Sequence, residues 1–86
     1  MKGGKFPMAR IVDGEKKNMI GRKVYELRTG KKMSQQMLSD KLETEAVYIC
    51  RGSVSRIEDG QRTVTDIELY GLAKVLGVPI EKLFED

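Results

Sequence analysis

The segment with the side chains best suited to chemistry is residues 51–60, RGSVSRIEDG. Val54 and Ile57 are its only large apolar residues and lie three positions apart, which gives a short helix one narrow buried stripe. The other positions carry small or cationic side chains. Such a helix can approach another molecule closely. Because the major groove of DNA admits one α-helix and offers acceptors to arginine, the pattern predicts a helix that contacts DNA.

The composition argues against an enzyme. The chain has no histidine and one cysteine. Without histidine, the commonest general base, the Ser/His and Cys/His nucleophile pairs and most zinc sites are excluded. We therefore expect no catalytic residues, no metal and no cofactor. A single cysteine cannot form an internal disulfide, which is typical of the reducing cytoplasm. We expect Cys50 to pack as a small hydrophobic residue, with oxidant sensing as the alternative.

Length and charge give broader bounds. The chain has 86 residues, which is enough for one small domain. No apolar run approaches the roughly 18 residues of a membrane helix, so we expect no membrane contact. The net charge is +3, and residues 1–32 hold ten Lys or Arg against three acids. This basic first third suggests contact with a polyanion, although lysines that merely solubilise a tail would give the same count.

The pattern along the chain predicts two parts. Residues 1–17 have several glycines, one proline and no helical period, so we expect a flexible basic arm. Residues 18–86 predict one helical domain that begins with Asn18 as an N-cap. The first helix presents Ile20, Val24 and Leu27 on one side and ends at Gly30.

Three further helices have clear boundary signals. Ser34 is placed to cap a second helix with Leu38 and Leu42 on its buried side. Residues 65–68, TDIE, have the form of a capping box for a longer helix that Gly77 ends. Pro79 then begins a last short helix. Together with residues 51–60, these segments predict an all-α domain of five helices.

The motifs resemble the phage-repressor and Cro type of helix-turn-helix regulator, also called the xenobiotic-response-element family. The matching pieces occur in the family's order and are residues 20–22, 26–28, 33–35, 38–42, 54–60, 72–78 and 83–84. The resemblance implies a five-helix, phage-repressor-like DNA-binding domain. It also implies roles for particular positions.

In this family the third helix reads base edges, which the resemblance transfers to Arg51, Gly52, Ser53, Ser55 and Arg56. Phosphate contacts fall at the start of the second helix and after the third, at Ser34, Gln35, Gln61, Arg62 and Thr63. A structural ion pair between the first and third helices is implied for Arg28 and Glu58.

The chain departs from the common form of the family in the turn before the third helix, which is several residues longer. We expect Tyr48 and Ile49 to pack within this turn, with a phosphate contact from Tyr48 as the alternative. Tyr70 is expected to be half-buried. Leu83 and Phe84 are consistent either with closing the core or with a dimer surface.

These observations predict a cytoplasmic, sequence-specific regulator that binds double-stranded DNA as a homodimer and represses transcription. An antitoxin that binds both DNA and a protein partner is the main alternative. A protein-interaction module without DNA binding is disfavoured by Arg51, Arg56 and Arg62, because such a module needs no cationic helix face.

Overall fold

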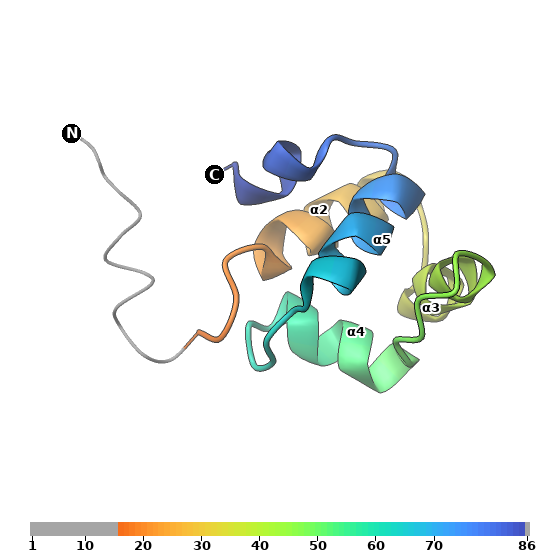
Figure 1. Cartoon of the computed structure of the whole chain (residues 1–86), viewed down its shortest axis with the longest axis horizontal. Coiled ribbons are helices and arrows are strands. Elements are labelled where there is room, and N and C mark those ends of the chain that lie inside the picture. The colour runs from red at the N-terminus through yellow and green to blue at the C-terminus, as the bar shows by residue number, and fades with distance from the viewer. Residues whose placement is uncertain (1–15, 86) are drawn as a thin grey trace.

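The computed structural model describes residues 16–85, which form four α-helices followed by a short 3-10 helix (Figure 1). In chain order they are α2 (Gly21–Gly30), α3 (Gln35–Thr44), α4 (Arg51–Glu58), α5 (Asp66–Leu76) and η1 (Ile80–Phe84). The predicted all-α fold of five helical segments is confirmed. Most of the predicted arm, residues 1–17, lies outside the described residues. Within the described range, no helix is long and apolar enough to cross a bilayer.

The capping chemistry read from the sequence is present at three helix ends. Ser34 Oγ accepts a hydrogen bond from the Met37 amide at 3.0 Å and so caps α3. Thr65 Oγ1 accepts from the Glu68 amide, and Glu68 Oε1 accepts from the Thr65 amide, which is the predicted capping box of α5. Gly77 ends α5 in the left-handed region at φ 72°.

Helix α2 differs in detail from its predicted bounds. It begins at Gly21 rather than directly after Asn18, although Asn18 Oδ1 still accepts hydrogen bonds from the amides of Ile20 and Gly21. At the other end, Gly30 remains helical. The left-handed residue that turns the chain is Lys32, at φ 59°.

All the helices share one core, and α4 packs against both α2 and α3 (Figure 1). The core residues come from every helix, from the segments on either side of α2 and from the turn before α4: Ile20, Val24, Met33, Leu38, Leu42, Val47, Ile49, Val54, Ile57, Leu72, Ala73, Leu76 and Leu83. Leu83 is fully buried, which settles its part in closing the core, whereas Phe84 is 44% exposed. Arg28 is buried beside this core, and the side chain of its ion-pair partner Glu58 is only 4% exposed.

The crossing of α2 and α4 requires a residue without a side chain. A Cβ atom added to Gly21 would collide with the carbonyl oxygen of Ile57 and lie 2.9 Å from that of Glu58. These are backbone atoms at the C-terminal end of α4, so they cannot turn away as a flexible side chain could. Gly21 therefore sets how closely the start of α2 approaches the end of α4.

This crossing generates a test of the packing. We expect Gly21→Ala to lower the free energy of unfolding by about 1–3 kcal/mol or more, because α2 and α4 must move apart. Gly30→Ala is the matched control in the same helix, since a Cβ atom there meets nothing within 4 Å. Urea unfolding of both variants measures the effect. Equal stability of the two variants would contradict the close crossing.

Candidate nucleic-acid interface

Helix α4 has a buried side and a solvent side, as its sequence predicts. Val54 and Ile57 are each 1% exposed and face the core. The predicted base-reading residues occupy the remaining surface, with the two serines partly exposed and the others exposed: Arg51, Gly52, Ser53, Ser55 and Arg56. Contact of these residues with bases stays a prediction. What the structure supplies is a short helix whose solvent side carries no large apolar residue.

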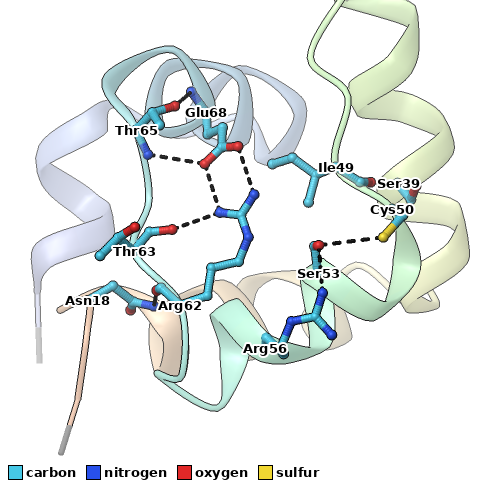
Figure 2. Close-up of polar contacts among 10 residues, drawn as sticks. All are labelled: Asn18, Ser39, Ile49, Cys50, Ser53, Arg56, Arg62, Thr63, Thr65 and Glu68. Carbon is cyan, nitrogen blue, oxygen red and sulfur yellow. Dashed lines mark hydrogen bonds and ion pairs between the residues drawn. The ribbon is translucent and has the colours of Figure 1, made fainter.

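At the N-terminus of α4, three polar side chains lie together (Figure 2). Cys50 Sγ is 3.4 Å from Ser53 Oγ, and Arg56 Nη2 donates to the same hydroxyl at 3.1 Å. The hydrogen bond with Ser53 lowers the pKa of the Cys50 thiol. Cys50 is exposed, so the expectation that it packs as a small hydrophobic residue is wrong. As the N-cap, it precedes the first turn and lies outside the core.

The predicted ion pair between Arg28 and Glu58 is present and buried. Arg28 Nε and Nη2 donate to the two carboxylate oxygens of Glu58 at 2.6 and 3.0 Å. Arg28 Nη1 donates to the Met33 carbonyl at 2.7 Å. The two charged side chains are only 9% and 4% exposed. The hydrogen bond to Glu58 raises the pKa of Arg28.

Gln35 belongs to this buried network rather than to an open surface. Its Nε2 donates to Glu58 Oε1 at 3.0 Å, and the residue is partly buried. Ser34, the other residue predicted to bind phosphate here, is exposed at the N-terminus of α3. The network therefore joins α2, the start of α3 and the end of α4, while the first turn of α3 remains open to solvent at Ser34.

The segment after α4 contains three predicted phosphate ligands in two different settings. Gln61 and Thr63 are exposed. Arg62 instead forms a double hydrogen bond with Glu68, with Nη1–Oε1 and Nη2–Oε2 distances of 2.9 and 2.8 Å (Figure 2). Arg62 Nη1 also donates to the Thr63 carbonyl at 2.7 Å. The structure thus gives Arg62 an internal partner, an outcome that local sequence did not reveal.

Asn18 ties the segment before α2 to the end of α4. Its Nδ2 donates to the carbonyl oxygens of Ile57 and Arg62 at 3.0 and 2.9 Å, while Oδ1 accepts from the start of α2. Lys17 N donates to the Gly60 carbonyl at 2.7 Å beside it. The sequence indicates that Asn18 caps the first helix. It gives no signal for the two hydrogen bonds that Asn18 Nδ2 donates, because their acceptors are 39 and 44 residues away.

Comparison with known proteins agrees with this architecture. The helix-turn-helix family profile matches residues 24–83. The chain belongs to the helix-turn-helix family, of the phage-repressor and Cro type. It is similar to the crystal structure of the restriction-modification controller protein C.AhdI from Aeromonas hydrophila, with 32% identity and a TM-score of 0.68 over 77% of this chain and 92% of that one. No curated protein sequence matches the chain.

Within this helix-turn-helix, α3 and α4 are the two helices and residues 45–50 are the turn. Val47 and Ile49 are buried, so the prediction that Ile49 packs is confirmed. Tyr48 is 75% exposed, and the expectation that it packs within the turn is wrong. Tyr70, expected to be half-buried, is 60% exposed because α5 already fills the core with other residues of its buried side.

The Arg62–Glu68 pair generates a pH prediction. The hydrogen bond from Arg62 lowers the pKa of Glu68 from its ordinary value of 4.5. When folding lowers the pKa of a carboxyl group, the ionised group stabilises the folded state at pH values above its ordinary pKa. This stability is lost as the pH falls through the pKa of the folded state. We therefore expect the stability advantage of the wild type over Glu68→Gln to shrink as the pH falls below about 4.5. Gln can still accept in the capping box.

Urea unfolding of both proteins between neutral pH and acid measures this difference. The control repeats the comparison in an Arg62→Gln background, where the main cause of the pKa shift is gone and the pH dependence should be smaller. A wild-type stability advantage that stays constant with pH would show that Arg62 does not lower the pKa of Glu68.

Proposed function

We propose that this helix-turn-helix protein is a sequence-specific regulator that binds double-stranded DNA as a homodimer and represses transcription. The observation that carries the proposal is the character of α4. Its solvent side has Arg51, Gly52 and Arg56, while its C-terminal end is held by the Arg28–Glu58 pair. Arginine can donate two hydrogen bonds to guanine N7 and O6 in the major groove. Such a regulator acts on DNA in the cytoplasm.

Phosphate contacts would place α4 in the groove. The N-terminus of α3 offers backbone amides beside the exposed Ser34, a setting that favours an anion. Gln61 and Thr63 can bind phosphate as they stand, since both are exposed. Arg62 and Gln35 would first have to leave Glu68 and Glu58. We therefore assign the principal phosphate contacts to Ser34, Gln61 and Thr63, and keep Arg62 and Gln35 as secondary ones.

A homodimer is supported by an exposed apolar surface outside α4. Met19 is 47% exposed and Phe84 is 44% exposed. They line one depression together with the partly buried Val64 and Leu69 and with Thr63, so the proposed dimer surface adjoins the proposed phosphate contacts. A second copy that covers this surface would present two α4 helices, and a two-fold site would have its half-sites about 34 Å apart, one turn of DNA.

The similarity to C.AhdI favours one biological setting. That protein is a restriction-modification controller, and the likeness covers most of both chains. We propose that the present chain likewise controls genes of a restriction–modification system. Sequencing the duplexes that the protein selects from a random pool, and locating them next to such genes, tests this setting.

Readout by α4 gives the functional prediction. We expect Arg51→Ala and Arg56→Ala each to weaken binding to the preferred duplex by about 1–3 kcal/mol, because each removes a contact to a base edge. On a scrambled duplex the same variants should lose much less. Fluorescence anisotropy titrations of both duplexes at one salt concentration measure the losses.

The matched control is Arg22→Ala. The Arg22 side chain is 91% exposed on α2, so this variant removes the same charge from another surface. It should leave the preference between the duplexes unchanged. If Arg51→Ala and Arg56→Ala weaken both duplexes equally, α4 does not read the sequence.

A further inference from the structure

Tyr48 is the most exposed large hydrophobic side chain of residues 16–85, at 75%. Its neighbours Val47 and Ile49 are only 6% and 3% exposed. Along this non-helical stretch, buried and exposed side chains therefore alternate, as they do in extended backbone. Tyr48 points away from the core while the residues on each side of it anchor the chain.

The turn that carries Tyr48 is held at several points. Val47 N donates to the Leu42 carbonyl at 3.0 Å, and Ser39 Oγ donates to the Ile49 carbonyl at 2.7 Å. The Val47 side chain fits against Gly71 of α5, where an added Cβ atom would lie 2.7 Å from Val47 Cγ2. A turn fixed on both sides of Tyr48 holds the backbone of this residue at a defined position.

Tyr48 lies next to the N-terminal end of α4, the end that helices bound in the major groove place against bases. Tyr48 comes two residues before the N-cap Cys50 and three before Arg51, so its Cα lies within about 7 Å of the N-cap Cα. Figure 2 shows Ile49 and Cys50 at the start of α4, with Ser39 of α3 beside them. A duplex that received Arg51 would therefore have its backbone close to the turn.

We propose that Tyr48 is a DNA-contacting residue whose hydroxyl donates a hydrogen bond to a phosphate oxygen beside the N-terminus of α4. The inference rests on the proposed function and extends the DNA-binding surface from α4 into the turn. Tyrosine hydroxyls are among the neutral donors that bind DNA phosphates and so fix the register of a protein on the duplex.

Three variants test the contact. Tyr48→Phe removes only the hydroxyl, and Tyr48→Ala removes the ring as well. Tyr70→Phe is the control, because Tyr70 is also highly exposed, at 60%, but lies on α5. Each is titrated with the preferred and the scrambled duplex over a range of salt concentrations, after circular dichroism and thermal unfolding confirm the fold.

We expect Tyr48→Phe to lose about fivefold in affinity per half-site, on both duplexes alike, as befits one hydrogen bond to the backbone. The slope of log affinity against log salt should stay unchanged, because a neutral donor releases no counterion. Tyr48→Ala should lose at least as much, and Tyr70→Phe nothing.

Two results would overturn the inference. Full affinity of Tyr48→Phe excludes the hydroxyl contact, whether or not Tyr48→Ala is weakened. A loss confined to the preferred duplex would instead make Tyr48 a base reader and equally contradict the phosphate contact. The wild type is measured first. If the wild type binds neither duplex in preference to the other, the proposed function itself fails. If the wild type shows the preference and Tyr48→Phe binds as tightly as the wild type, only the Tyr48 contact fails.

Discussion

The buried ion pair between Arg28 and Glu58 is the interaction on which the position of α4 depends. One guanidinium contacts Glu58 through two nitrogens and the Met33 carbonyl through the third, and Gln35 adds a further donor to the carboxylate. Burying two charges brings little net stability, because the desolvation cost offsets their attraction. The directional hydrogen bonds of the Arg28–Glu58 pair nevertheless fix the end of α4 against α2 and α3. We regard the pair as a positioning device.

Other contacts hold the same end of α4 from different directions. Gly21 allows α2 to touch the carbonyls of the last turn, and Asn18 binds the Ile57 and Arg62 carbonyls. Arg62 is in turn bound to Glu68 of α5. The C-terminal end of α4 is therefore fixed, and the N-terminal end with Arg51 stays open to solvent. This asymmetry suits a helix that enters a groove by its N-terminus.

The sequence was sufficient for those parts of the structure that depend on local pattern. The caps of Ser34 and Thr65 and the stop at Gly77 follow from the residue and its near neighbours, and all three are present. The Arg28–Glu58 pair was predicted from the family resemblance alone. Because its members are 30 residues apart, no local rule joins them.

The parts that could not be predicted depend on contacts distant in sequence or on which way a side chain turns. The amide nitrogen of Asn18 donates to one carbonyl at the far end of α4 and to another in the segment after it. The apolar neighbours of Tyr48 and Cys50 suggested that both would be buried. In an extended segment that alternates sides, those neighbours fill the core and leave Tyr48 exposed.

The most direct test of the account is a double-mutant cycle of Arg28→Met and Glu58→Leu, measured both by urea unfolding and by affinity for the preferred duplex. Each single variant leaves one buried charge unpaired and should lose about 3–5 kcal/mol of stability. The double variant should regain most of that stability, since two apolar residues replace the pair, yet bind the duplex more weakly than the wild type because α4 has lost its anchor. Additive losses of stability, or a double variant that binds as tightly as the wild type, would contradict the positioning role of the pair.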